Sequence, residues 1–394
     1  MPARLIRDGV HAVGAVDWDR RLFDELIPLP DGTTYNAYLV QGRDKIALLD
    51  TVDPAKEQEL FRHLKELKIS RVDYLIAHHA EQDHSGTIPR ILEMYPGARV
   101  LCSPKCREIL ETHLAVPSER ITAVNDRETL DLGGRTLEFI SAPWVHWPDT
   151  MFTYLKEDRV LFTCDFLGAH LASSELYAVD EPAVHHSAKR YFAEIMMPFR
   201  SNIRTHLDRI QGLAVDVICP SHGPVHNRPG FILGAYRDWA SDQVRNEVLI
   251  PFVSMHGSVR VMVDHFTEAL IKRDVRVLQF NLTRTDIGEL AMAMVDAATI
   301  VVGTPTVLVG PHPAAVYAVY LVNALRPKTK FISLIGSYGW AGKMPETIKS
   351  MVPNLKATFL EPVVIRGYPR AEDLTALERL ADTIHDQHRA VGAR

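Results

Sequence analysis

Short apolar runs alternate with amphipathic segments along the chain, and this alternation predicts an α/β protein. Near the N-terminus the pattern predicts strands over residues 34–40 and 45–50 and a helix over residues 55–67, with Asp53 and Pro54 as its N-cap and first helical position. Alternation continues to about residue 229, a helix over residues 235–246 leads into a second alternating series, and a helix over residues 371–391 ends that series. We therefore expect two domains, residues 1–246 and residues 247–394.

Composition and charge narrow the class of protein. The 394 residues are too many for one ordinary core, and 46% hydrophobic and 24% charged residues are typical of a soluble globular chain. A net charge of -5 without a basic run argues against a nucleic-acid partner. No apolar stretch reaches membrane-spanning length, residues 1–4 begin no secretory signal, and the four cysteines form no C-x-x-C pair. We expect a cytoplasmic protein with free thiols and no membrane partner.

The segment His79-Ala80-Glu81-Gln82-Asp83-His84 directly follows an apolar run over residues 72–77. On an extended loop, alternation places His79, Glu81 and Asp83 on one side, while Asp83 and His84 diverge and can serve a second ion. Such a cluster of ionisable groups is costly unless the groups are paired or bind metal. The segment therefore predicts a two-metal site and disfavours a solvated polar loop.

Three further candidate ligands, His146, Asp165 and His222, each stand where a short apolar strand gives way to a loop. Strand ends that converge on one edge of a sheet sandwich would bring them to the same site. This series resembles the metallo-β-lactamase fold, whose usual H-x-H-x-D-H motif binds zinc, although Glu81 stands where that motif has His.

The candidate ligands can be divided between two ions. We assign His79, Glu81 and His146 to one ion, Asp83 and His222 to the other, and Asp165 to a bridging position. His84 is either a ligand of the second ion or a residue that supports its ligands. Because this set mixes imidazoles with hard carboxylate oxygens, it favours iron or manganese over zinc, and we expect a redox-active di-iron centre.

The second half of the chain carries a phosphate-loop signal. A strand over residues 248–253 is followed by Ser254-Met255-His256-Gly257-Ser258-Val259 and then by an amphipathic helix. Backbone N–H groups and the positive end of the helix can bind phosphate in such a turn without Lys or Arg. Two more loops follow the strands predicted over residues 299–302 and 330–335, and three loops at successive carboxyl ends define a mononucleotide crevice.

These loops resemble the FMN site of flavodoxin, in which the first loop takes the phosphate and the other two flank the flavin ring. Tyr338 and Trp340 are the candidates for stacking on the ring, although they could instead pack a loop against the domain. Val259 stands where the family usually has Thr, and His256 where an aromatic residue is common. The residues expected to bind FMN are Ser254, Met255, His256, Gly257, Ser258, Val259, Thr304, Pro305, Thr306, Val307, Ser337, Tyr338, Gly339, Trp340, Ala341 and Gly342.

Together the two halves resemble the flavodiiron proteins, also called A-type flavoproteins, over nearly the full chain. The matching motifs are His79 to His84, His146-Trp147-Pro148-Asp149, Cys164-Asp165 followed by Gly168, Ser221-His222-Gly223, and the three flavin loops. The resemblance implies a metallo-β-lactamase-like αββα sandwich followed by a flavodoxin-like doubly wound parallel sheet. It also implies that FMN passes electrons to two non-haem irons that reduce dioxygen to water or nitric oxide to nitrous oxide.

The family resemblance carries further expectations. Electrons would come from an external donor such as rubredoxin or a reduced deazaflavin, and the subunits would form a head-to-tail homodimer or a dimer of dimers. Asp149, His170 and His84 would supply protons or orient ligands. Two other functions compete: a zinc-dependent hydrolase with an appended flavodoxin domain, and a flavin electron carrier with a vestigial metal domain.

Overall fold

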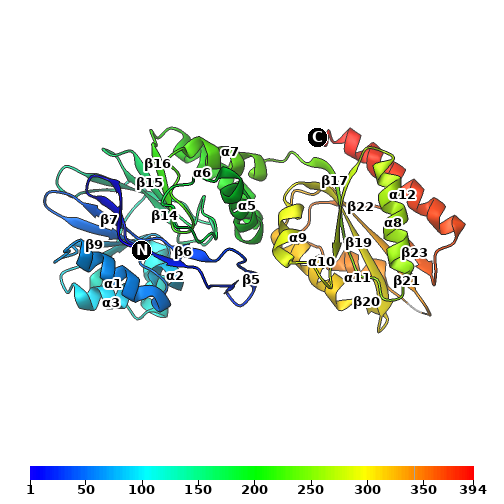
Figure 1. Cartoon of the computed structure of the whole chain (residues 1–394), viewed down its shortest axis with the longest axis horizontal. Coiled ribbons are helices and arrows are strands. Elements are labelled where there is room, and N and C mark those ends of the chain that lie inside the picture. The colour runs from blue at the N-terminus through cyan, green and yellow to red at the C-terminus, as the bar shows by residue number, and fades with distance from the viewer. Residues whose placement is uncertain (341) are drawn as a thin grey trace. The chain divides into compact units, whose positions relative to one another are not determined.

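The structure is a computed structural model that describes residues 1–340 and 342–394. The chain divides into two compact units (Figure 1). The first comprises Met1–Tyr191 and Phe199–Ala240, and the second comprises Phe192–Pro198 and Ser241–Arg394.

The first unit is built on two main β-sheets. The strands of one sheet lie in the order β1 (Arg4–Arg7), β2 (Val10–Ala12), β7 (Tyr38–Gln41), β8 (Ile46–Leu49), β9 (Tyr74–Ala77), β10 (Arg99–Cys102) and β11 (Ile121–Ala123). The other sheet has the order β12 (Thr129–Asp131), β13 (Thr136–Ser141), β14 (Met151–Leu155), β15 (Val160–Cys164) and β16 (Val217–Pro220). Two small ribbons pair β3 (Ala15–Asp17) with β6 (Thr33–Tyr35) and β4 (Leu22–Phe23) with β5 (Ile27–Pro28).

Helices cover the outer faces of this sandwich. They are α1 (Glu57–Glu66), α2 (Gln82–Ser85), α3 (Ile88–Met94), α4 (Pro104–His113), α5 (Glu181–Tyr191), α6 (Arg200–Gln211) and α7 (Pro229–Ala240), with short turns η1 (Pro54–Lys56) and η2 (Ser118–Arg120). Two further short helices, η3 (Phe192–Met196) and η4 (Met197–Phe199), follow α5 in the chain, and their residues 192–198 belong to the second unit. Leu49 and Ile76 of the first sheet meet Phe139 and Phe162 of the second in one buried cluster, which joins the sheets by burying their apolar faces together. The predicted αββα sandwich is confirmed.

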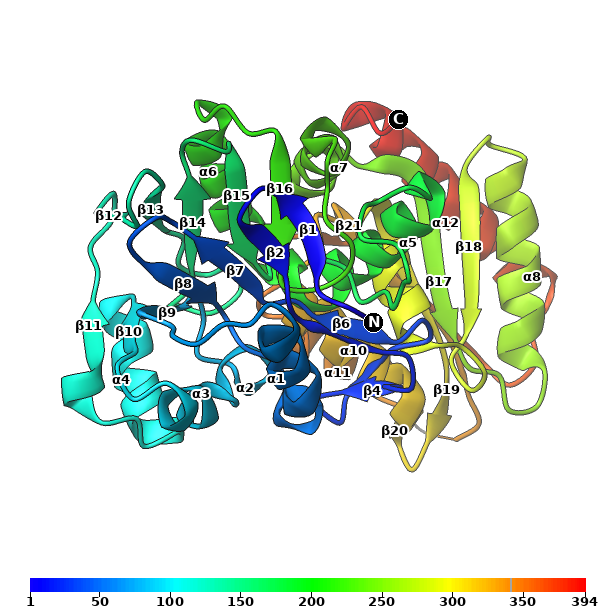
Figure 2. The same ribbon diagram turned by 60° about the vertical axis from the view of Figure 1, so that its left-hand side comes forward.

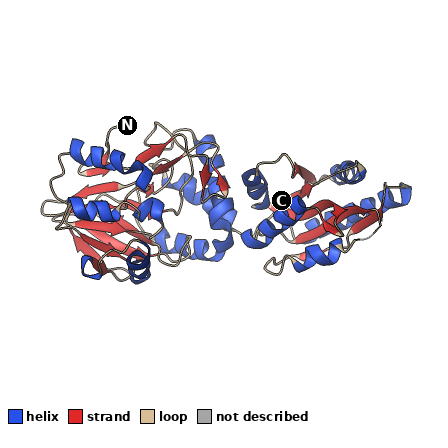
Figure 3. Ribbon diagram, turned by 90° about the horizontal axis from the view of Figure 1, so that it is seen from below, coloured by secondary structure: helices blue, strands red, loops and turns tan. Residues whose placement is uncertain are grey.

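The second unit is a parallel sheet with helices on both faces (Figures 2 and 3). Its strands are β17 (Arg245–Phe252), β18 (Arg276–Asn281), β19 (Ala297–Val307), β20 (Gly310–Pro311), β21 (Phe331–Tyr338), β22 (Thr358–Phe359) and β23 (Val363–Arg366), in the order β18-β17-β19-β21-β22, with β23 also on β21. Its helices are α8 (Ser258–Ile271), α9 (Ile287–Met294), α10 (Pro313–Leu325), α11 (Met344–Ser350) and α12 (Ala371–Ala390). This is the predicted flavodoxin-like topology, and its strand order reverses between β17 and β19, where such folds bind ligands at the carboxyl ends of the strands.

Several predicted elements differ in extent from the observed ones. The strand expected over residues 34–40 is divided between β6 and β7, and the strand expected over residues 330–335 continues to Tyr338 as β21. The helix expected over residues 235–246 runs from Pro229 to Ala240, and residues 245–246 already belong to β17 because Arg245 N–H donates to Asp296 O and Asn246 N–H to Arg394 O. The loop expected over residues 303–306 is strand, since β19 continues to Val307. Thr304 there pairs with Gly336 of β21, and Thr306 with Pro311 of β20.

Asp53 caps the first turn as predicted: its Oδ1 accepts the Ala55 N–H at 2.8 Å, ahead of η1 and α1. All four cysteines are buried free thiols, as expected. Within the described ranges, every helix is too short or too polar to cross a membrane.

Candidate functional site

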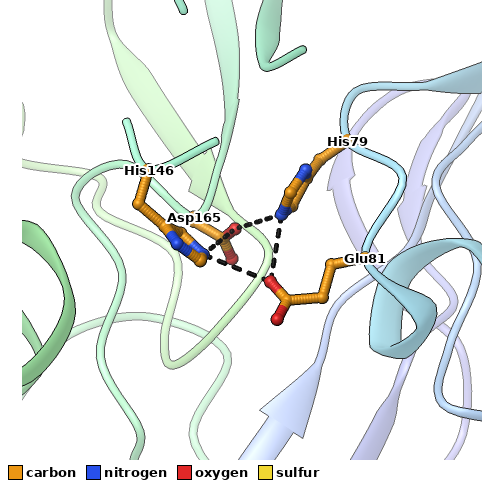
Figure 4. A group of neighbouring side chains, drawn as sticks. All are labelled: His79, Glu81, His146 and Asp165. Carbon is orange, nitrogen blue, oxygen red and sulfur yellow. Dashed lines mark hydrogen bonds and ion pairs between the residues drawn. The ribbon is translucent and has the colours of Figure 1, made fainter. Parts of the chain in front are cut away.

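Four of the predicted ligands converge in the first unit at the ends of its strands (Figure 4). Glu81 Oε2 lies 3.0 Å from His79 Nε2 and 3.2 Å from His146 Nε2. Asp165 Oδ2 lies 3.5 Å from His79 Nε2 and 3.4 Å from His146 Nε2. His79 and Glu81 follow β9, His146 stands between β13 and β14, and Asp165 follows β15, so the two sheets together position this first cluster.

Asp83, His84 and His222 form a second cluster beside the first. His222 Nε2 lies 3.1 Å from Asp83 Oδ2, and His84 Nε2 lies 3.4 Å from Asp83 Oδ1. Asp165 links the clusters, because its Oδ1 lies 2.9 Å from His84 Nε2 and 3.3 Å from His222 Nε2 while its Oδ2 faces the first cluster. One carboxylate thus presents one oxygen to each cluster.

The backbone of the 79–84 segment differs from the extended loop expected from the sequence. Glu81 is extended, with φ -61° and ψ 140°, but Gln82–Ser85 form one helical turn, α2. The turn is held from outside, because Thr51 Oγ1 donates to His84 O at 2.5 Å and Ser85 Oγ donates to Ala80 O at 2.7 Å. As a result Glu81 faces the first cluster, whereas Asp83 and His84 both belong to the second.

Hydrogen bonds fix the orientation of two ligand imidazoles. His79 Nδ1–H donates to Asp149 Oδ1 at 3.2 Å, and His222 Nδ1–H donates to Thr34 O at 2.6 Å. Because the partners can only accept, each neutral ring turns an Nε2 lone pair toward the carboxylates of its cluster. Lone pairs and carboxylate oxygens repel each other unless a proton or a metal cation lies between them.

The pKa values of His222 and Asp165 also indicate that the cluster needs positive charge. Burial disfavours the imidazolium of His222, but the carboxylates of Asp165 and Asp83 outweigh burial and raise its pKa to about 10. Burial likewise opposes the charge on Asp165, yet the imidazoles of His84, His146 and His222 hold its pKa well below the usual range. The buried carboxylates therefore require positive charge around them.

The donors fit a pair of metal ions. Both carboxylate oxygens of Asp83 and of Asp165, and Nε2 of His84, are buried and make no hydrogen bond of acceptable geometry within the described residues, despite the short distances above. Buried polar atoms are normally satisfied, and a metal ion satisfies several converging atoms at once. Four imidazoles and three carboxylates around two positions match the chemistry expected for di-iron.

Some neighbouring residues were not singled out from the sequence. Thr34 supports His222 through its backbone carbonyl, which no residue-type signal reveals. Asp50 binds His78, next to His79, through both Oδ2 to Nδ1 at 2.7 Å and Oδ1 to the backbone N–H at 2.8 Å. Of the expected supporting residues, Asp149 contacts His79, and His170 packs against His222 with ring centroids 4.7 Å apart and the rings tilted by 57°.

A pocket of about 210 Å³ lies at the carboxyl ends of the strands in the second unit. Parts of all three predicted loops line it, together with Gly367, which follows β23 and was not predicted. The lining residues are Met255, His256, Ser258, Val259, Pro305, Thr306, Ser337, Tyr338, Gly339 and Gly367. Because Gly367 follows a fourth parallel strand, the rule that selected the other loops could have found it.

Some residues predicted to bind the cofactor lie outside this lining: Ser254, Gly257, Thr304, Val307, Trp340 and Gly342. Thr304 is fully buried and uses its Oγ1 to accept the His312 N–H, and Trp340 is 76% exposed. Ala341 lies outside the described residues. The remaining predicted residues do come together around one pocket.

The pocket suits a phosphorylated flavin. Gly257 immediately precedes the fourteen-residue helix α8 and has φ +91°, a conformation that side chains disfavour. Ser258 and Val259, the first residues of α8, line the pocket, and the N-terminus of a helix favours phosphate. The lining adds the Tyr338 ring and apolar surface from Met255, Val259 and Pro305, which suits a flavin ring.

Comparisons with known proteins agree with this geometry. Residues 33–223 match the family model described as "ODP family beta lactamase". The chain is 36% identical over 381 residues to the nitric oxide reductase of Moorella thermoacetica, covering 94% of each chain. It is 31% identical over 372 residues to flavo-diiron protein FprA2 of Clostridium acetobutylicum, covering 90% of this chain and 92% of the relative. The chain belongs to the flavodiiron protein family.

A solved structure extends the match to the whole fold of a flavodiiron protein. The rubredoxin oxygen:oxidoreductase of Desulfovibrio gigas superposes with a TM-score of 0.95 and 28% identity, and the match covers 100% of both chains. The fold, the family and the oxidoreductase class expected from the sequence are confirmed. The FMN and di-iron cofactors expected from the sequence are those of this family.

Proposed function

We propose that this flavodiiron protein reduces dioxygen to water, nitric oxide to nitrous oxide, or both, at two irons held by the His79–His222 ligand set. The observation that carries the proposal is the position of Asp165, whose two carboxylate oxygens face two separate groups of buried ligands. The names of the Moorella and Desulfovibrio relatives, a nitric oxide reductase and an oxygen oxidoreductase, support these two substrates.

The residues of this chain have distinct tasks in that reaction. His79, Glu81 and His146 would hold one iron, Asp83, His84 and His222 the other, and Asp165 both. With the cofactors bound, two ferrous ions and reduced FMN supply the four electrons that dioxygen reduction consumes, or the two that coupling of nitric oxide consumes.

Buried aromatic side chains pack around His222 and cover that side of the second cluster. Phe23 and Tyr191 lie 6.3 Å and 5.9 Å from the His222 ring, between centroids, and both are buried. The His170 ring contacts all three, with centroids 5.2 Å from Phe23, 4.9 Å from Tyr191 and 4.7 Å from His222. Burial together with the neighbouring His222 lowers the pKa of His170 well below the usual range. This wall would exclude bulk water from the reacting gas and keep His170 neutral.

Electron delivery is the second part of the proposal. An external donor such as rubredoxin or a reduced deazaflavin would reduce FMN in the pocket between the 254–259, 305–306 and 337–339 loops. The name of the Desulfovibrio relative, which includes rubredoxin, supports a donor of that kind. We further propose a head-to-tail homodimer or dimer of dimers, in which FMN of one subunit serves the irons of its partner, and a cytoplasmic location.

Cofactor content and gas reactivity test the proposal on the same sample. We expect about two irons and one FMN per chain, and fast reoxidation of the anaerobically reduced protein by dioxygen, nitric oxide or both in a stopped-flow mixer. In Asp165→Asn we expect iron loss and gas-driven reoxidation slowed at least about tenfold, because the bridging charge is gone, with FMN content unchanged.

Glu138→Gln is the matched control, because Glu138 is a carboxylate of the same unit that pairs with Arg127 and Lys156 away from the ligands. Glu138→Gln should keep both cofactors and should be reoxidised by the gas at the wild-type rate. Two zinc ions per chain, with reoxidation unchanged by Asp165→Asn, would refute the reductase and favour a hydrolase.

A further inference from the structure

The loop that would hold the FMN phosphate has little positive charge close to it. Its residues 254–259 connect β17 to α8. The described part of the pocket lining contains one imidazole, His256, one phenol, Tyr338, and no lysine or arginine. A phosphate with about two negative charges at pH 7 would therefore depend on backbone N–H groups and on very few side chains.

The arginine that directly follows the loop in sequence is engaged elsewhere. Arg260 stands in the first turn of α8, but its guanidinium stacks over the Phe252 ring at 4.4 Å and lies 3.2 Å from both Asp264 and Gln279. Its backbone N–H donates to Ser254 Oγ at 3.1 Å, which ties the start of the loop to the helix. Arg260 thus stabilises the loop, and its guanidinium charge is paired with Asp264 and not available to the pocket.

The side chain of Val259 also contributes no polar group. Val259 is 1% exposed and packs in the core of the second unit with Val263 and Phe266. A threonine there would offer a hydroxyl to the phosphate, whereas valine offers methyl groups. Ser258 and His256 are then the polar side chains of this loop that line the pocket.

We infer that His256 supplies the positive charge that balances the FMN phosphate in this chain, and that FMN is consequently held more weakly as the pH rises through neutrality. This inference rests on the proposed function, since it assumes that FMN occupies the pocket. His256 stands one residue before Gly257, so its side chain and the N-terminal N–H groups of α8 border the same part of the pocket.

The direction of the pH effect follows from linkage. An imidazole has an ordinary pKa of about 6.5, and a nearby phosphate dianion stabilises its charged form and raises that pKa in the complex. FMN affinity gains fully from the charge below the pKa of the free protein, loses that gain as the pH rises to the pKa of the complex, and is constant above it. Protonation of the phosphate itself, near pH 6, affects every variant equally.

Other ionisable groups surround the pocket. They are Tyr338, Arg260, Asp264, Arg366, whose Nε donates to Gly339 O, and His312, which caps α10 by accepting the Ala314 N–H on Nδ1. Phenol, guanidinium and carboxyl groups ordinarily titrate outside pH 6 to 8.5, so only His312 could imitate His256 in that range.

Flavin binding to the full-length apoprotein tests the inference without any turnover. We would titrate FMN and riboflavin, followed by flavin fluorescence, from pH 6 to 8.5. For the wild type we expect the Kd of FMN to rise about tenfold over this range and the Kd of riboflavin, which has no phosphate, to stay constant. In His256→Gln the Kd of FMN should not change with pH and should stay at the high value that the wild type has at pH 8.5.

Three variants serve as controls. Val259→Thr should strengthen FMN binding by a similar factor at every pH, because the added hydroxyl is uncharged, and keep the slope. Two further variants should behave as wild type. His265→Asn changes an imidazole of α8 that lies 3.2 Å from Glu378. His312→Asn changes the other imidazole near the pocket.

The other outcomes contradict either the role of His256 or the proposed function. FMN affinity that does not change with pH in the wild type, or a slope that survives in His256→Gln, overturns the role of His256. The same pH dependence of the riboflavin Kd would place His256 against the flavin ring and would also overturn its role in balancing the phosphate. If no flavin binds at any pH, the proposed function itself fails.

Discussion

At the scale of single residues, the carboxylate of Asp149 orients the ring of His79, a candidate metal ligand. Asp149 is buried, accepts from His79 Nδ1 at 3.2 Å and accepts the Ala80 N–H at 2.8 Å through its other oxygen. It thereby fixes the ring tautomer that turns Nε2 toward Glu81 and Asp165. Burial opposes its charge, but its bonds to His79 and Ala80 hold its pKa below the usual range, so it remains an acceptor.

Replacing Asp149 should weaken iron binding without touching a ligand atom. We expect Asp149→Ala to lower iron affinity about 10- to 100-fold, because the ring of His79 can then rotate or adopt the other tautomer. The measurement is iron retained per chain against increasing chelator. FMN content should not change.

Asp158→Ala is a suitable control, since Asp158 pairs with Arg135 in the same unit at 2.9 Å, away from the ligands. Asp149→Asn keeps one acceptor oxygen for His79 and should fall between the wild type and Asp149→Ala. Iron retention equal to the wild type in both Asp149 variants would show that neighbouring packing alone orients His79.

At the scale of elements, helix α12 is fastened to the sheet of the second unit by a buried histidine. His388 Nδ1–H donates to Asn246 Oδ1 at 2.8 Å in β17, and Thr299 Oγ1 of β19 donates to His388 Nε2 at 2.7 Å. The bond from Thr299 requires the neutral ring, because Nε2 can accept only while it carries no proton. Burial, and to a smaller extent the neighbouring His385, lowers the pKa of His388 to about 4.

Acid should therefore loosen α12. An unfolded histidine titrates near 6.5 and the folded one near 4, so its contribution to stability is complete above pH 6.5 and is lost as the pH falls toward 4. We expect the free energy of opening of α12, from amide hydrogen exchange, to fall by roughly 1–3 kcal/mol between pH 7 and pH 4.

A variant with glutamine at this position isolates the effect. Gln in His388→Gln can accept from Thr299 and donate to Asn246 without titrating, so the fall should largely disappear. His385→Gln removes only the smaller contribution and should keep most of it. An equal fall in wild type and His388→Gln would assign acid sensitivity to other groups.

The same scale shows what the sequence could predict and what it could not. The convergence of the candidate metal ligands was predictable because each follows a short apolar strand, and strands of a sandwich end at common edges. The helical turn at 82–85 was not, since Thr51, far away in sequence, holds the His84 carbonyl. Gly303 and Pro305 suggested a loop, but pairing with β21 and the β20 hairpin extends the strand. Thr51 and β21 are distant along the chain from the residues they hold, and a local pattern does not contain such partners; the β20 hairpin is local.

At the scale of the whole molecule, the proposed head-to-tail dimer makes each catalytic pair of centres depend on two chains. Asp165→Asn should disable the irons and keep FMN. Gly257→Val should prevent FMN binding and keep the irons, because a β-branched residue is strained at φ +91°. A heterodimer that carries one variant in each chain still joins the intact FMN of one chain to the intact irons of the other.

Differently tagged variants, coexpressed and purified through both tags in sequence, would yield this heterodimer. We expect about half of the wild-type gas reductase rate, because one of the two pairs of centres across a two-fold dimer remains complete. Each variant homodimer should be inactive, and a heterodimer of either variant with wild type should also keep about half. If electrons pass from FMN to iron within one chain, the double heterodimer has no complete pair and should be inactive, whereas the heterodimers with wild type keep their rate. Activity in the doubly tagged sample alone therefore distinguishes transfer between subunits from transfer within one.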